Sequence, residues 1–247
     1  MSLFDLTGRR VLVTGANAGI GQAIAVEMAK AGAHVICAGR RNCDATLAAI
    51  ADTQGTAEQA VADFADPMAG KALVNEAGPL DILVNNAGII RREDSVDFSE
   101  ADWDAVMDVN LKALFFTTQA FAKQALGKES HAKVVNIASL LSFQGGIRVP
   151  SYTASKHGVA GLTKILANEW AAQGINVNAI APGYIATDNT TALREDPVRS
   201  KEILSRIPAG RWGNATDIAG TAVFLSSKAA DYIHGAVLNV DGGWLAR

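Results

Sequence analysis

The strongest constraint on the fold is a regular alternation of short β-branched segments with longer segments of helical spacing. Seven segments have the composition of strands, and helix-length stretches separate most of them. They cover residues 10–14, 34–38, 59–63, 80–84, 133–137, 175–180 and 236–240. Parallel strands need long crossover connections, and helices usually provide these on both faces of the sheet. The sequence therefore predicts an α/β fold with a parallel, doubly wound sheet.

Helix limits and strand number refine this prediction. One helix is expected from Gly19 to Ala31, and a later one from about Ser151 to just before Gly174. A barrel of eight strands and eight helices would also fit a chain of 247 residues. We favour the open sheet, because seven strands are counted and glycines directly follow the first of them. The whole chain, 1–247, is expected to form a single Rossmann-type domain.

Composition argues against several classes of protein. No uncharged apolar run approaches the ~20 residues needed to cross a bilayer, and residues 1–5 do not begin a signal peptide. We therefore expect a cytoplasmic protein with no membrane partner. The 22 basic and 25 acidic residues are mixed along the chain, which predicts no nucleic-acid partner. Cys37 and Cys43 are too few for a disulfide framework and have no partners at metal-ligand spacing, so no metal is expected.

One stretch, residues 187–212, departs from the regular alternation. It is dense in charged and turn-forming residues, including 194–197 and 207–210, and it lies between the sixth strand and the last helix. We expect it to form a mobile flap of helices over a substrate site. A solvated surface excursion without function is the alternative interpretation.

A glycine-rich turn connects the first strand to the first helix. Its sequence is Thr14-Gly15-Ala16-Asn17-Ala18-Gly19-Ile20-Gly21. Gly15 permits a tight turn, Gly19 exposes backbone to a pyrophosphate, and Gly21 allows the helix to pack closely on the strand. The free N–H groups of the helix N-terminus would attract the same anion. This turn, including Asn17 and Ile20, is our candidate site for the phosphates of a dinucleotide, although such turns can also be purely structural.

The end of the second strand bears on which dinucleotide would bind. An NAD site usually places a carboxylate there for the ribose hydroxyls, whereas an NADP site needs a cation. The sequence offers Arg40 and Arg41 and no carboxylate, which favours NADP slightly over NAD unless both arginines only solubilise the surface. Asp63 and Phe64 follow the third strand, and Asp63 would either accept a hydrogen bond from adenine or stabilise a turn.

Polar side chains also follow the fourth and fifth strands. Asn86, Ala87 and Gly88 end the fourth strand with small residues that let a flat ligand approach the backbone. Ser139 places a hydroxyl at the carboxyl end of the fifth strand, where open α/β sheets bind ligands, although it could equally cap a turn. Asn110 lies among apolar neighbours in a helical segment, so its amide needs a buried partner.

Tyr152 and Lys156 are four residues apart in an expected helix, so their side chains share one face. A free tyrosine titrates near ~10, which is too high for acid–base work at neutral pH. A nearby ammonium group and an oxidised nicotinamide ring would both stabilise the phenolate. With Ser139 to hold a substrate oxygen, these residues form a candidate group for proton exchange.

These motifs together resemble the short-chain dehydrogenase/reductase family, in its compact single-domain form. The resemblance spans the chain and rests on the glycine-rich turn, Asn85-Asn86-Ala87-Gly88, Asn110, Ser139, Tyr152-x-x-x-Lys156 and Pro182-Gly183, in this order. It implies a seven-stranded parallel sheet, NAD or NADP as hydride carrier, and a homotetramer.

The resemblance also implies roles for individual residues. Tyr152 would exchange a proton with the substrate oxygen, and Lys156 would bind the nicotinamide ribose and lower the pKa of the tyrosine. Ser139 would orient the carbonyl, and Asn110 would hold a water molecule in a proton relay. The residues expected to face the nicotinamide are Pro182, Gly183, Ile185 and Thr187.

Within this family, four longer stretches are similar to enzymes of sugar-acid breakdown, the 2-dehydro-3-deoxy-D-gluconate 5-dehydrogenases, also called 2-deoxy-D-gluconate 3-dehydrogenases. The stretches are residues 88–95, 140–152, 207–213 and 240–247. The similarity implies hydride transfer at C5 of a small sugar-acid substrate. Arg148 and Arg92 are our candidates for binding its carboxylate, although each could equally form a structural ion pair. Gln144 is the candidate for a hydroxyl group, and Arg40 departs from the NAD dependence common in this group.

Two other functions fit the same scaffold, because a fold does not fix a substrate. One is a 3-oxoacyl-thioester or general alcohol dehydrogenase. The other is a dinucleotide-binding regulator without catalysis, which the intact set of Ser139, Tyr152 and Lys156 argues against.

Overall fold

A parallel sheet forms the centre of the computed structural model, which describes residues 2–127 and 131–246. Its seven strands are ordered β3-β2-β1-β4-β5-β6-β7, and all neighbours are parallel. They are β1 (Arg10–Thr14), β2 (His34–Gly39), β3 (Thr56–Val61), β4 (Ile82–Asn85), β5 (Ala132–Ile137), β6 (Ile175–Pro182) and β7 (Val237–Val240). This architecture confirms the predicted fold class. Arg247, which ends one of the stretches quoted above, lies outside the described residues.

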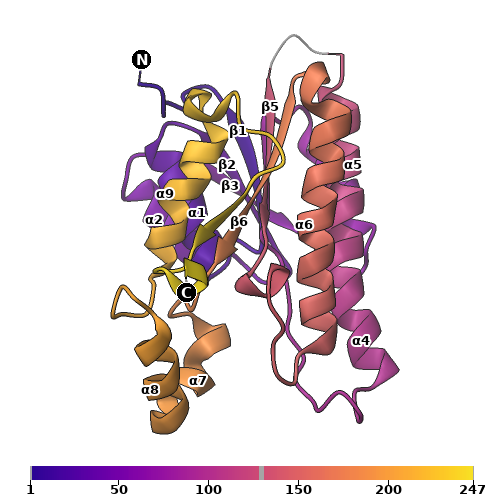
Figure 1. Ribbon diagram of the computed structural model, residues 1–247. Helices are drawn as coiled ribbons and strands as arrows, with labels where there is room; N and C mark the ends of the chain where they lie inside the picture. Colours follow the sequence, from indigo (N-terminus) through magenta and orange to yellow (C-terminus); the bar gives the residue numbers. More distant parts are fainter. Residues whose placement is uncertain (1, 128–130, 247) are drawn as a thin grey trace.

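Helices cover both faces of the sheet (Figure 1). On one face lie α1 (Gly19–Lys30), α2 (Asp44–Ala51) and α9 (Ala215–Ser226), which share an apolar core with β1 and β2. On the other face lie α3 (Ala69–Ala77), α4 (Glu100–Met107), α5 (Leu114–Ala125) and α6 (Pro150–Trp170), where a second core is centred on Phe121 and Leu83. Within the described ranges, no helix is long and apolar enough to cross a membrane.

One predicted strand was misplaced along the chain. We expected the third strand at residues 59–63, whereas β3 runs from Thr56 to Val61. It is an edge strand that pairs with β2 alone in this sheet, and most of its side chains are exposed. Because burial does not select apolar residues there, the sequence pattern marks the strand poorly.

The order of the sheet reverses between β1 and β4, whose strands pair through Val11, Leu12 and Val13. Ligands of open α/β sheets bind outside the carboxyl ends of the strands at such a switch point. Below this edge in Figure 1 lie the short helices α7 (Thr191–Glu195) and α8 (Pro197–Arg206), which belong to the segment 187–212. The fold therefore brings this segment to the edge where a ligand is expected.

A buried polar network joins the middle of the sheet to the helices on one face. The amide nitrogen of Asn85 donates to Thr118 Oγ1 of α5 at 2.8 Å and to Asn136 Oδ1 at 2.9 Å. The amide of Asn136 donates in turn to Thr163 Oγ1 of α6 at 3.0 Å. All four side chains are buried, so each bond satisfies a group that water does not reach.

We expect Asn136→Ala to lower the free energy of unfolding by about 2–3 kcal/mol, because the substitution leaves buried polar groups of Asn85 and Thr163 without hydrogen-bond partners. Urea unfolding followed by circular dichroism measures the change. Asn75→Ala, on the exposed surface of α3, is the matched control and should change stability by less than about 0.5 kcal/mol. Equal stability of the two variants would contradict the importance of the network.

Candidate active site

The glycine-rich turn is fixed against the end of β4. The amide of Asn86 donates to the carbonyls of Thr14 and Gly15 at 3.0 and 3.1 Å. The Thr14 hydroxyl accepts the backbone N–H groups of Asn86 and Ala87, each at 3.0 Å. Asn86, which we expected at the cofactor, thus also locks two strand ends together, and it lines the cavity beside them.

The turn has the shape that a dinucleotide pyrophosphate requires. Gly15 and Gly19 have positive φ angles of 66° and 57°, which favour glycine. A Cβ at Gly21 would collide with the Gly15 carbonyl and the Asn86 amide, so only glycine lets α1 begin this close to the strand. Ala18 precedes the helix and offers no side-chain cap, which leaves the first N–H groups available to an anion.

A cavity of about 340 Å³ runs from this turn to the expected chemical end of the site. It is lined by most of the predicted cofactor residues, including Gly15, Asn17, Gly19, Ile20, Gly21, Asn86, Ala87, Gly88, Tyr152, Lys156, Pro182, Gly183, Ile185 and Thr187. The residues present therefore fit a dinucleotide, whose pyrophosphate would lie at the turn and whose reactive end would lie near Tyr152.

The adenosine end differs in detail from the sequence-based expectation. Arg41 lines the cavity, whereas Arg40, which we had favoured, is exposed and is not among the described lining residues. Asp63 accepts the backbone N–H of Ala65 at 3.0 Å, as a turn residue does, and Phe64 is buried in the core. The structure thus brings Arg41 to the cavity, while Asp63 and Phe64 have structural contacts of their own.

Ser139, Tyr152 and Lys156 come together where β5 ends and α6 begins. The Ser139 hydroxyl accepts the backbone N–H of Leu141 at 3.2 Å, and Ser139 and Tyr152 line the same cavity. Ser139 therefore both caps a turn, the helix Leu140–Ser142, and faces the tyrosine. The Lys156 ammonium lies 5.5 Å from the centre of the Tyr152 ring and donates to the Ile137 carbonyl at 2.6 Å.

Burial dominates the protonation of both groups. It lowers the pKa of Lys156 to about 8. It raises the pKa of Tyr152, and the Ser139 hydroxyl and the positive charge of Arg92 oppose that rise. The lowering that we expected from Lys156 is not among these effects, since its ammonium points at a backbone carbonyl and not at the phenol oxygen. The influence of Arg92 was not foreseen from the sequence.

Asn110 is buried in a six-residue π-helical segment, Asp108–Ala113, between α4 and α5. Its amide bonds both backbone groups of Ile89, accepting at 2.8 Å and donating at 2.9 Å, and it also donates to Ser155 Oγ at 3.2 Å. The expected need for buried partners is thus met. A π-helical turn changes the hydrogen-bonding partners of the backbone and is frequent at functional sites.

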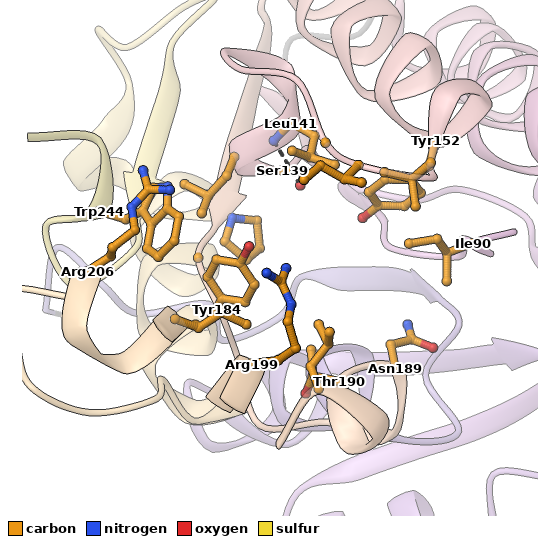
Figure 2. A pocket seen from close by; sticks show the side chains of 18 of the residues that line it. Ile90, Ser139, Leu141, Tyr152, Tyr184, Asn189, Thr190, Arg199, Arg206 and Trp244 are labelled. Atoms are coloured by element: carbon orange, nitrogen blue, oxygen red, sulfur yellow. Dashed lines mark hydrogen bonds between the residues drawn. The ribbon is translucent and has the colours of Figure 1, made fainter. Parts of the chain in front are cut away.

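A second cavity, of about 610 Å³, opens on the other side of Ser139 and Tyr152 (Figure 2). Arg92 lines it and donates to the Asn189 carbonyl at 3.2 Å. The sequence-based candidates missed several lining residues, namely Tyr184, Asn189, Thr190, Leu193, Arg199, Glu202, Arg206 and Trp244. The charged and turn-rich composition of residues 187–212 indicated most of this region as part of a site. It did not indicate which of its side chains line the cavity.

Other substrate candidates have structural partners instead. Arg148 forms ion pairs with Glu93 and Asp94, both at 3.1 Å, and is not among the described residues that line the cavity. Gln144 accepts the indole N–H of Trp244 at 3.2 Å. Arg211, in the flap, is paired with Asp217 at 2.7 and 2.9 Å. Among the candidate arginines from the sequence, the structure therefore brings Arg92 to the cavity.

Comparisons with known proteins agree over the full length of the chain. A profile of the short chain dehydrogenase family matches residues 9–198. The chain is 54% identical to a 2-dehydro-3-deoxy-D-gluconate 5-dehydrogenase of Bacillus subtilis, over 99% of this chain and 97% of the relative. It is 52% identical to an enzyme of the same name from Dickeya dadantii, over 100% and 99%.

A solved structure has the same fold over all of both chains. It is a proposed 2-deoxy-D-gluconate 3-dehydrogenase from Agrobacterium tumefaciens with bound NADP, 72% identical, with a TM-score of 0.98 and 100% of each chain covered. With the glycine-rich turn, the Tyr152 and Lys156 pair and the seven-stranded sheet in place, these findings assign the family. The chain belongs to the short-chain dehydrogenase family.

Proposed function

We propose that the protein is an NADP-dependent dehydrogenase that interconverts 2-dehydro-3-deoxy-D-gluconate and its 2,5-diketo form by hydride transfer at C5. One observation carries this proposal. The cavity that fits a dinucleotide and the cavity on the substrate side meet at Ser139 and Tyr152, so the proton-exchanging group faces both. The names of the similar enzymes supply the class of substrate.

The dinucleotide would supply the hydride acceptor or donor, and the chain would supply the proton chemistry. In the direction of oxidation, the Tyr152 oxygen takes the proton of the substrate hydroxyl, and in the direction of reduction it returns one to the carbonyl oxygen. The Ser139 hydroxyl, which lines the same two cavities as Tyr152, would hold the same oxygen. Both groups project from segments packed in the core, so little ordering is needed before reaction.

Lys156 contributes through its charge and its position. With a pKa of about 8, its ammonium is mostly protonated at neutral pH. The charge of Arg92 favours the phenolate of Tyr152 over the phenol, whereas the Lys156 ammonium lies 5.5 Å from the centre of the ring and points at the Ile137 carbonyl. We propose that these two cations, together with the oxidised nicotinamide, bring Tyr152 into the range where it can act as a base.

We also propose that Asn110 supports a proton path at the buried side of the site, as the family resemblance implies. Its side chain is fully engaged with Ile89 and Ser155. A water molecule would therefore be held by the backbone of the π-helical segment and not by the Asn110 amide. The amide's part is to fix that segment beside α6.

The charges of the substrate-side cavity favour an acidic substrate. Arg92, Arg199 and Arg206 line it with a single carboxylate, Glu202, among the described residues. A site with excess positive charge attracts an anion and gives an uncharged acyl chain no comparable gain. The charges of the cavity therefore favour a sugar acid over a 3-oxoacyl thioester as the substrate.

We further propose that the enzyme is a homotetramer of the cytoplasm and that the segment 187–212 closes over the substrate. The tetramer rests on the family resemblance. Cys37 and Cys43 are both buried free thiols, in agreement with a reducing compartment. Sedimentation velocity would test the tetramer, and a monomer at micromolar concentration would contradict it.

Tyr152→Phe should lower kcat by at least ~10²-fold, because it removes the group that exchanges the proton. Binding of NADPH, measured by fluorescence, should stay within a few-fold, since the ring remains. The substitution removes one oxygen only, so circular dichroism should be unchanged. Activity close to that of the wild type would contradict the assigned role.

The cofactor preference gives a second test. If Arg41 binds the 2′-phosphate, Arg41→Gln should raise the KM for NADPH by about 10-fold or more and leave the KM for NADH nearly unchanged, since NADH lacks that phosphate. Arg40→Gln is the matched comparison and should have the smaller effect. A wild-type preference for NADH of tenfold or more in kcat/KM would contradict NADP dependence.

A further inference from the structure

The substrate-side cavity extends well beyond Tyr152, and helix α8 forms part of its far wall. Five residues of α8 line it, namely Arg199, Glu202, Ile203, Ser205 and Arg206. Their spacing places them on one face of the helix. Ile203 is buried in a small apolar cluster with Leu140 and Trp244, which turns this face of α8 toward the cavity.

We propose that Arg199 and the Tyr184 hydroxyl form the binding site for the carboxylate of the substrate, across the cavity from Tyr152. This inference rests on the proposed function and deepens it, because it names the residues that select an acidic substrate. In Figure 2 the Arg199 guanidinium lies beside the Tyr184 hydroxyl, with Tyr152 on the opposite side of the cavity.

Arg199 has free hydrogen-bonding capacity that faces the cavity. Its Nη1 donates to Glu202 Oε2 at 2.9 Å, one turn along the same helix. Within residues 2–127 and 131–246, its Nε and Nη2 have no hydrogen-bond partner. These two groups form one edge of the guanidinium, which matches the two oxygens of a carboxylate. Glu202 thus holds the side chain in place while leaving a binding edge open.

The Tyr184 hydroxyl is held at a fixed position by aromatic neighbours. The ring of Tyr184 packs edge-on against Trp212, with centroids 5.6 Å apart, and against Trp244 at 4.7 Å. Burial raises the pKa of this hydroxyl, so at neutral pH it is a proton donor. No hydrogen bond uses it within the described part of the chain. A carboxylate at Arg199 would therefore find a second, rigid donor.

The other arginines of the cavity are less suitable. Arg206 stacks on the ring of Trp244 with its central carbon 4.0 Å from the ring centre, so its planar face is occupied by an apolar surface. Arg92 acts on Tyr152, which places its charge at the reacting end of the site. In 2-dehydro-3-deoxy-D-gluconate the carboxylate, C1, is separated from the reacting C5 by the length of the carbon chain. The carboxylate therefore needs a cation at a distance from Tyr152, and Arg199 meets this requirement.

The experiment is a comparison of two substrates and several variants by steady-state kinetics with NADP as oxidant. The substrates are 2-dehydro-3-deoxy-D-gluconate and its methyl ester, which lacks the negative charge. Arg199→Gln should raise the KM for the acid by at least about 10-fold, with kcat changed less than about threefold, and should leave the KM for the ester unchanged. Arg199→Lys should restore part of the loss, because it keeps the charge without the two-pronged edge. Tyr184→Phe should show a smaller loss of the same kind.

Lys201→Gln is the matched control, because it removes one positive charge from an exposed position of α8 outside the cavity lining. It should leave the KM for the acid within twofold. Circular dichroism and the KM for NADP should be the same in all variants, which would show that folding and the cofactor site are intact.

Two results would overturn the proposal in distinguishable ways. If the wild type oxidises the acid but Arg199→Gln raises the KM for acid and ester equally, or for neither, Arg199 does not bind the carboxylate. A selective loss in Arg92→Gln instead would assign that role to Arg92. If the wild type oxidises no sugar acid, the proposed function itself fails, and this proposal fails with it.

Discussion

Both ends of the site depend on a set of hydrogen bonds that joins the end of β1 to the end of β4. The Asn86 amide bonds the Thr14 and Gly15 carbonyls, and the Thr14 hydroxyl accepts two backbone N–H groups from beyond β4. These bonds join strand ends exactly where the sheet order reverses, and where each strand alone would leave polar groups unpaired. The glycine turn can then remain open to an anion, because its shape is held from the side and not by a helix cap.

From these hydrogen bonds the site extends along the carboxyl edge of the sheet. β5 ends at Ile137, whose carbonyl accepts a hydrogen bond from the Lys156 ammonium. The hydroxyl of Ser142, in the short helix after β5, donates to the backbone carbonyl of Lys156. These two bonds hold Lys156, and with it the helix that carries Tyr152, at the end of β5. The carbonyl stabilises the ammonium, but burial makes its charge costly and lowers its pKa to about 8.

Much of the fold, and the residues that meet at the candidate site, could be predicted from the sequence for physical reasons. Strands such as β5 and β6 are buried along their whole length and are mostly apolar, so the sequence pattern indicates them, whereas the exposed edge strand β3 was shifted. Ser139, Tyr152 and Lys156 could be proposed as a group because residue type, the four-residue spacing of Tyr152 and Lys156 on one helix, and the position of Ser139 after a strand are all read from the sequence. The choice between Arg40 and Arg41 was not accessible, because it depends on which way consecutive side chains turn after a strand end.

The residues that line the second cavity were the least predictable, because their positions depend on tertiary contacts. Arg148 and Arg92 are both near the catalytic segments in sequence, yet the first is neutralised by Glu93 and Asp94 and only the second reaches the cavity. Arg199 and Tyr184 come from segments whose orientation is fixed by packing against Trp212, Trp244 and Leu140. No local pattern encodes that orientation.

Electrostatics links the two halves of the cavity. A substrate carboxylate brings a negative charge into the space that Tyr152 faces, and an uncompensated anion there would raise the pKa of the tyrosine further and oppose its action as a base. Arg199 would neutralise the carboxylate at its own end, while Arg92 opposes the rise in the Tyr152 pKa at the other. An enzyme for an uncharged alcohol would need the charge of Arg92 against the effect of burial, but would have no carboxylate for Arg199 to neutralise. Under the proposal above, the two arginines would therefore serve the proton chemistry and the recognition of an acidic substrate respectively.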